Sequence, residues 1–162
     1  MIDPGEKYFL QPGSIYVSEK PCLIHTVLGS CVSVCLWDSG RGCGGMNHYI
    51  YGRWTKGERN AKYGDVSIRY MIGLMTGNGS RCADLRAHIT GGGFNPELGS
   101  EIGRENRAVA EEILKEKGIT VVTADVGGQT GRKVVFNNMT GEIVVYKGIN
   151  VRKSDWYGGQ EG

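Results

Sequence analysis

A cysteine and a histidine in this chain stand at a spacing that could bring a thiol and an imidazole together. Cys31 follows Gly29-Ser30 and opens an alternating stretch, and His48 comes seventeen residues later. A two-residue turn over 39–40 would place them directly opposite each other in an antiparallel hairpin, with Cβ atoms about 4.5–5.5 Å apart on one face. An imidazole at that distance can take the thiol proton and later return it to a leaving group. The spacing therefore predicts a nucleophile, Cys31, with His48 as its base.

Neighbouring residues could complete such a site. Gly29 allows close approach of another backbone, and the N–H groups around Ser30 and Cys31 can hold an oxyanion, so Gly29 and Ser30 are the expected substrate and oxyanion residues. A cysteine–histidine pair also needs a third group to orient the imidazole. The hydroxyl of Thr26 is the first candidate and the imidazole of His25 is the reserve. Neighbours on a strand face opposite sides, so only one of the two can serve. Weaker alternatives are Asp38 and Asp125.

Metal binding and redox chemistry are the competing interpretations of these side chains. A metal site would need Cys31, Cys35, His48 and His25 to converge, and their spacing matches no recognised ligand pattern. A disulfide between Cys31 and Cys35 is disfavoured, because residues i and i+4 of a strand lie about 13 Å apart, beyond the roughly 4.4–6.8 Å a bridge allows. We therefore predict no metal and no cofactor. The residues expected to be structural are Cys22, Cys35, Cys43, Cys82 and His88.

The bulk composition excludes several classes of protein. A chain of 162 residues with 40% hydrophobic residues is most economically one domain. A net charge of +2 without a basic block gives no reason to expect nucleic-acid binding. No apolar run reaches the ~18 residues of a membrane span, and the first residues lack the features of a signal peptide. The five cysteines, an odd number without a C-x-x-C pair, favour a cytoplasmic protein.

The elements that must position these residues can be read from hydrophobic periodicity. Helical stripes predict helices over 61–76 and 102–117, the first with Tyr70, Met71 and Met75 facing inward. The 27 glycines fall between short apolar runs, which indicates many tight turns. Strands are expected over 15–17, 22–26, 31–37, 45–50, 86–90, 119–124 (buried), 132–137 and 142–147. Two helices and about seven short strands predict an α/β (α+β) single-domain layered fold over 1–162, with irregular tails at about 1–11 and 152–162.

Strand 31–37 has two unlike faces. Val32, Val34 and Leu36 form an aliphatic face that suits a hydrophobic core. Cys31, Ser33, Cys35 and Trp37 form the other, which is too small and polar to be a core by itself, so another layer should cover it. The return strand adds Met46 and His48 to this second side. Two glycine runs, 91–93 and 127–131, are expected to be turns that can line the site as backbone donors, because neither has phosphate-loop spacing.

Several motifs together resemble one family. The run Leu28-Gly29-Ser30-Cys31 continues to Asp38 and is followed by Gly44-Gly45-Met46-Asn47-His48. The likeness continues over much of the chain, about 12–148, through the motifs at 91–93, 102–106, 118–119, 125–128 and 131–136. In these residues the chain resembles the CheD family of bacterial chemoreceptor glutamine deamidases.

The resemblance implies a fold, an activity and two partners. It implies an α/β/β sandwich like that of bacterial deamidating toxins, and hydrolysis of glutamine side chains on methyl-accepting chemotaxis receptors, with Cys31 as nucleophile and His48 as base. The family's third residue is a threonine or serine six positions before the cysteine, where this chain has His25, with Thr26 next to it. The alternative implied role is that of an adaptor, with weak catalysis, that binds and stimulates a CheC-type phosphatase of phosphorylated CheY.

Overall fold

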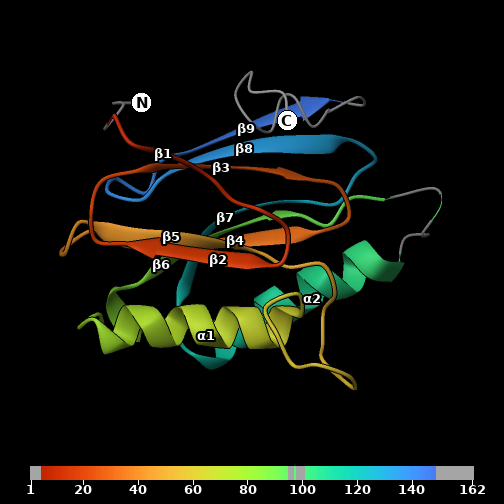
Figure 1. Cartoon of the computed structure of the whole chain (residues 1–162), viewed down its shortest axis with the longest axis horizontal. Helices are drawn as coiled ribbons and strands as arrows, with labels where there is room; N and C mark the ends of the chain where they lie inside the picture. The colour runs from red at the N-terminus through yellow and green to blue at the C-terminus, as the bar shows by residue number, and fades with distance from the viewer. Residues whose placement is uncertain (1–4, 95–96, 98–100, 149–162) are drawn as a thin grey trace.

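The computed structural model describes residues 5–94, 97 and 101–148, which form three layers (Figure 1). A four-stranded sheet of order β1-β3-β8-β9 packs on a five-stranded sheet of order β2-β5-β4-β6-β7, and two helices cover the far face of the second sheet. The layered α/β/β prediction is confirmed, with nine strands in the described part instead of about seven. The elements are β1 (Lys7–Phe9), β2 (Ser14–Ser18), β3 (Leu23–Leu28), β4 (Val32–Asp38), β5 (Cys43–His48), α1 (Gly64–Gly77), the 3-10 turn η1 (Cys82–Asp84), β6 (Arg86–Gly91), α2 (Glu101–Glu116), β7 (Thr120–Val126), β8 (Gly131–Asn137) and β9 (Ile143–Gly148).

Strand β4 lies in the middle layer and is buried along its whole length. Its aliphatic face, Val32, Val34 and Leu36, packs into the core shared with the two helices. Its other face contributes Cys35 and Trp37 to a second core, between the sheets, together with side chains of β3 and β8. Both predicted faces are confirmed, and the layer that covers the cysteine face is the four-stranded sheet.

The helices occupy the predicted segments, but α1 is rotated relative to the expected stripe. It buries Ile68, Met71, Ile72 and Met75, whereas the Tyr70 side chain is 62% exposed. Helix α2 buries Val109, Ala110, Ile113 and Leu114. Gly118, at φ +70°, ends it, which allows the N–H of Ile119 to bond the Leu114 carbonyl.

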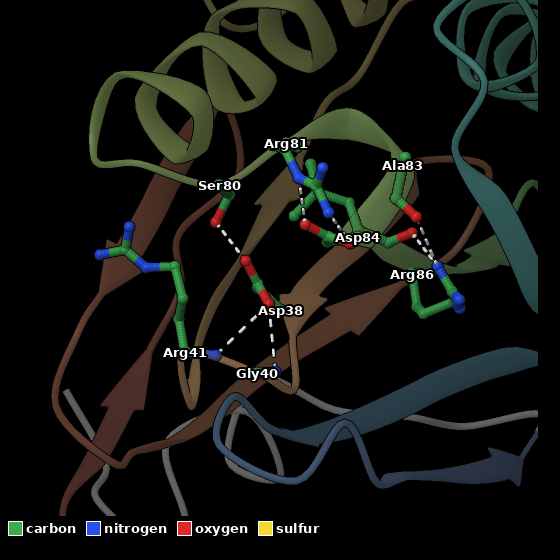
Figure 2. Close-up of polar contacts among 9 residues, drawn as sticks. Asp38, Gly40, Arg41, Ser80, Arg81, Ala83, Asp84 and Arg86 are labelled. Carbon is green, nitrogen blue, oxygen red and sulfur yellow. Dashed lines mark hydrogen bonds and ion pairs between the residues drawn. The ribbon is translucent and has the colours of Figure 1, made fainter.

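The β4–β5 hairpin has a different register from the predicted one. Its turn is the four residues 39–42, so that Asp38 pairs with Cys43 and Cys35 with Met46. The Asp38 carboxylate shapes this turn: one oxygen accepts from the backbone N–H groups of Gly40 and Arg41, and the other accepts from the Ser80 hydroxyl (Figure 2). The register therefore differs by two residues. An even shift keeps every side chain on its predicted face.

Two further expectations are corrected. Strand β7 is not buried: it is the edge of its sheet, and Val121 and Val122 are 38% and 52% exposed. The first eleven residues are not wholly irregular, because β1 pairs in parallel with β3. The expected tail at 152–162 lies outside the described residues. In the described part of the chain, no helix is long and apolar enough to cross a membrane.

Candidate active site

The candidate site lies where the chain crosses from one sheet to the other. Strand β3 of the four-stranded sheet ends at Leu28, and β4 of the five-stranded sheet begins at Val32. The connection 29–31 therefore carries Cys31 between the two layers. His48 is the last residue of β5, which pairs with β4, and Thr26 lies on β3. The three groups thus come from the two sheets and the link between them.

Thr26 and His48 are joined across the sheets by a hydrogen bond. Thr26 is fully buried, His48 is 2% exposed, and the Thr26 Oγ1 lies 2.7 Å from the His48 Nδ1. The same hydroxyl donates its one proton to the carbonyl of Leu10, at 3.0 Å. A carbonyl can only accept, so the hydroxyl accepts from Nδ1, which must carry the proton. The neutral imidazole then has its lone pair on Nε2, which is the arrangement a general base needs.

Burial keeps the His48 imidazole and the Cys31 thiol neutral at neutral pH. It lowers the pKa of His48 to about 4, so the imidazole is unprotonated at neutral pH. Burial also raises the pKa of the half-buried Cys31 thiol to about 11, an effect that its own backbone N–H partly offsets. The site therefore holds a neutral thiol and a neutral imidazole, and not a thiolate–imidazolium pair. For this thiol to act as a nucleophile, it would have to lose its proton as it attacks.

Cys31 and His48 share a face as diagonal neighbours, not as the directly opposed pair that we predicted. Val32 and Tyr49 exchange two backbone hydrogen bonds, of 3.2 and 3.0 Å. This register sets Cys31 opposite Ile50, and His48 lies two residues before Ile50 on the partner strand, on the same face. Such diagonal neighbours lie about 7–8 Å apart, within reach of a ring side chain. Cys31 packs against the core between the sheets, the side from which Thr26 reaches His48.

The loop that carries the thiol is clamped through three successive carbonyls. The N–H of Gly93 donates to the Gly29 carbonyl at 3.0 Å, and the N–H of Gly92 donates to the Cys31 carbonyl at 2.8 Å. Between them, the Asn106 side-chain amide of α2 donates to the Ser30 carbonyl at 3.0 Å. A trans peptide points its N–H away from its carbonyl. The N–H groups of Ser30 and Cys31 therefore point away from Gly93 and Asn106, which fits the predicted oxyanion donors.

Asn106 is a site residue that the sequence alone did not reveal. It is fully buried, and its amide also donates to the Ile50 carbonyl at 2.9 Å, so it ties the Cys31 loop to the chain just after His48. The Tyr49 hydroxyl donates to the Asn106 backbone carbonyl. The available signal was an asparagine in the inward stripe of an otherwise apolar helix face, between Ile102 and Val109.

The glycines near Cys31 have unlike roles. Gly91 has φ +110°, and a Cβ there would lie 2.2 Å from the Cys31 carbonyl oxygen, so only glycine lets β6 approach the loop. The N–H groups of Gly92 and Gly93 are turned toward the Cys31 and Gly29 carbonyls, so in this structure they hold the loop. Gly29 is exposed, and a Cβ there would meet nothing within 4 Å. This side of Gly29 faces solvent, so no other backbone segment of the described chain packs against it as we expected.

The other sequence candidates lie elsewhere. His25 alternates with Thr26 on β3 and faces away from the site, with its ring 4.9 Å from that of Phe9. Asp38 is the last residue of β4, next to the hairpin turn and at the opposite end of the strand from Cys31. Asp125 forms ion pairs with Arg132 and Lys147.

His88 is a hydrogen-bonded strand histidine, as expected. Its Nδ1 lies 2.6 Å from the Thr123 hydroxyl, and its Nε2 donates to the Gly141 carbonyl at 2.7 Å. All five cysteines are free thiols, and burial strongly raises the pKa of Cys35. Among the described residues, no group of three or more His, Cys, Asp or Glu side chains is arranged to hold a metal ion.

Comparison with known proteins agrees with the resemblance seen in the motifs. A family model described as CheD chemotactic sensory transduction matches residues 51–147. A protein of Trichlorobacter lovleyi named probable chemoreceptor glutamine deamidase CheD is 40% identical over 149 residues, which cover 90% of this chain and 92% of that protein. The chain belongs to the CheD family.

Other CheD relatives agree in name and extent. The Sulfurimonas denitrificans protein is 37% identical over 86% of this chain and 93% of its own, and the Rhodospirillum rubrum protein is 36% identical over 90% and 84%. Both are also named probable chemoreceptor glutamine deamidase CheD. The crystal structure of Neisseria meningitidis protein NMB0706 covers 71% of this chain and 52% of its own, with a TM-score of 0.45 and 12% identity, a likeness too distant to bear on the site.

Proposed function

We propose that this CheD-family protein is a protein-glutamine deamidase that converts glutamine side chains of chemotaxis receptors to glutamate. The observation that carries the proposal is the 2.7 Å hydrogen bond from Nδ1 of His48 to the Thr26 hydroxyl. It leaves Nε2 of His48 as a base on the face that Cys31 occupies. The names of the CheD relatives supply the substrate class, chemoreceptor glutamine.

The first half of the reaction forms a thioester. Nε2 of His48 takes the Cys31 thiol proton as the sulfur attacks the side-chain amide carbon, which forms a C–S bond and places negative charge on the amide oxygen. The N–H groups of Ser30 and Cys31 stabilise that oxygen. The imidazolium then gives its proton to the amide nitrogen, the C–N bond breaks, and ammonia leaves.

The second half returns the enzyme to its resting state. Nε2 of the neutral His48 takes a proton from water, and the hydroxide oxygen attacks the thioester carbon. The C–S bond then breaks, and the imidazolium returns its proton to the Cys31 sulfur. The product is glutamate, and no cofactor takes part. Thr26 orients the imidazole throughout, because its hydroxyl accepts from Nδ1 in both the neutral and the protonated ring.

Mass spectrometry of receptor fragments tests the proposal. Wild-type protein should convert selected glutamines to glutamates, and Cys31→Ala should convert none, with Cys35→Ala as the matched control that keeps activity. Equal conversion by Cys31→Ala would refute the nucleophile. Docking on a CheC-type phosphatase remains a separate prediction, which requires that Cys31→Ala still stimulates phosphatase activity.

A further inference from the structure

A small pocket adjoins the loop that carries the nucleophile. It has a volume of about 260 Å³ and lies between the two glycine runs and α2. The 91–93 run that forms one wall is the one that donates to the Gly29 and Cys31 carbonyls. The pocket is therefore built on the backbone that positions the thiol. Its lining residues are Gly92, Phe94, Arg107, Gly127, Gly128 and Gln129.

Arg107 brings a positive charge into this pocket. Its side chain crosses Gly92 so closely that a Cβ at Gly92 would lie 2.5 Å from the Arg107 Cγ. A Cβ at Gly127 would lie 3.3 Å from its Nη1. The guanidinium therefore occupies a space lined by the backbone of Gly92 and Gly127. The N–H of Gly92 in turn donates to the Cys31 carbonyl. Larger side chains at Gly92 or Gly127 would fill that space.

The guanidinium of Arg107 has no carboxylate partner within 4.0 Å among the described residues. Its Nε donates to the Gly103 carbonyl of its own helix, at 3.3 Å. Arg104, one turn earlier on α2, instead pairs with Glu101. Arg107 is also only half exposed, so its charge is less screened by water than that of a surface arginine. A planar guanidinium in such a setting is suited to bind a carboxylate through two parallel hydrogen bonds.

We propose that Arg107 binds an aspartate or glutamate side chain of the protein substrate and so selects glutamines that lie near an acidic residue. The proposal rests on the deamidase function. The 260 Å³ pocket accommodates a short acidic side chain, and Phe94, 39% exposed at its rim, offers an apolar contact to the same segment. The substrate segment is thus anchored at the pocket while its glutamine amide reaches Cys31.

Binding to an inactive variant tests the proposal without catalysis. Fluorescence anisotropy would measure the dissociation constants of receptor-derived peptides for Cys31→Ala, with one glutamate placed in turn at each position around the target glutamine and an alanine peptide as reference. At one or a few positions, glutamate should tighten binding about 10- to 100-fold, the range expected of a charge-assisted bidentate contact. Adding Arg107→Gln should abolish the preference, and adding Arg104→Gln should leave it intact.

Charge reversal and turnover provide the second arm. Arg107→Glu should bind peptides with lysine at that position more tightly than peptides with glutamate. In the wild-type protein, which keeps Cys31, the preference for an acidic residue should appear mainly as a lower KM. Equal binding of glutamate and alanine peptides at every position, or a preference that survives Arg107→Gln, would overturn the proposal. A wild-type enzyme that deamidates all peptides alike would overturn it and leave the deamidase intact. An Arg107-dependent preference in binding without any deamidation would instead refute the deamidase.

Discussion

Thr26→Val tests whether the hydroxyl of Thr26 makes His48 a base. Valine has nearly the shape of threonine but replaces the hydroxyl with a methyl group. The variant loses the bond to Nδ1 of His48 and the bond to the Leu10 carbonyl, both in a fully buried setting. Nothing at this position then holds the proton on Nδ1. The imidazole can turn or adopt the tautomer that has its proton on Nε2, which cannot accept the thiol proton.

The structure sets the expected magnitudes. Each of the two buried polar groups that lose their partner costs about 1–3 kcal/mol, and the added methyl group returns about 1 kcal/mol, so Thr26→Val should lower the free energy of unfolding by about 1–5 kcal/mol. Losing the tautomer and the orientation of a general base should reduce kcat about 10- to 100-fold, below the roughly 10²–10⁴-fold that a general base contributes. KM should change little, because Thr26 lies below the surface.

Two matched variants distinguish a loss of kcat caused by the wrong His48 tautomer from one caused by lower stability. Thr26→Ser keeps the hydroxyl and should keep most of kcat, although it loses a buried methyl worth about 1 kcal/mol of stability. His25→Ala removes the imidazole that faces away from the site and should keep kcat. Urea unfolding and steady-state ammonia release would be measured on all four proteins. The reasoning fails if Thr26→Val is folded with unchanged kcat, or if His25→Ala is the variant that loses activity.

Three further predictions concern protonation and backbone contacts. Because the pKa of Cys31 is raised to about 11, its alkylation by iodoacetamide should be slow at pH 7 and accelerate as pH rises from 9 to 11; a fast rate that is already constant at pH 6 would contradict a neutral pair. Because the pKa of His48 is lowered from 6.5 to about 4, the unfolded chain binds more protons than the folded one below pH 6.5. The free energy of unfolding should therefore be highest above pH 6.5 and fall by up to about 3 kcal/mol as the pH falls to 4. In urea titrations His48→Gln should reduce this pH dependence, and an unchanged dependence would argue against a buried neutral imidazole. Gly91→Ala should lower stability by about 2 kcal/mol or more, since its φ is +110° and its Cβ would meet the Cys31 carbonyl, whereas Gly29→Ala should be neutral; equal thermal shifts in the two variants would refute the distinction.

The sequence predicted which side chains share a face but not their register. Alternation along β4 is enough to put Cys31 and His48 on one side, because parity survives any even shift. The shift of two residues came from the turn, where the Asp38 carboxylate bonds the Ser80 hydroxyl. Ser80 is 42 residues from Asp38, so no local pattern could reveal that contact.

Burial and long-range polar contacts were also beyond local reasoning. The β-branched residues of β7 predict a strand, yet the strand order that makes β7 an edge depends on how β6, α2 and β7 are connected in space. Asn106 shows the same limit, because its partners at Ser30 and Ile50 are 76 and 56 residues away. Helix periodicity predicts that its side chain faces inward, but it does not predict which carbonyls its amide bonds.

The candidate site exists only when the two sheets are packed together. His48 belongs to one sheet, the hydroxyl that holds its proton belongs to the other, and the thiol sits on the link between them. Packing of Phe136 and Trp37 in the core between the sheets therefore also maintains the Thr26–His48 bond. A cavity in this core, such as that of Phe136→Leu, would let the sheets shift relative to each other. Such a change should reduce kcat while the secondary structure is still intact, whereas an equal loss of stability on the helix side, at Ile113, should not.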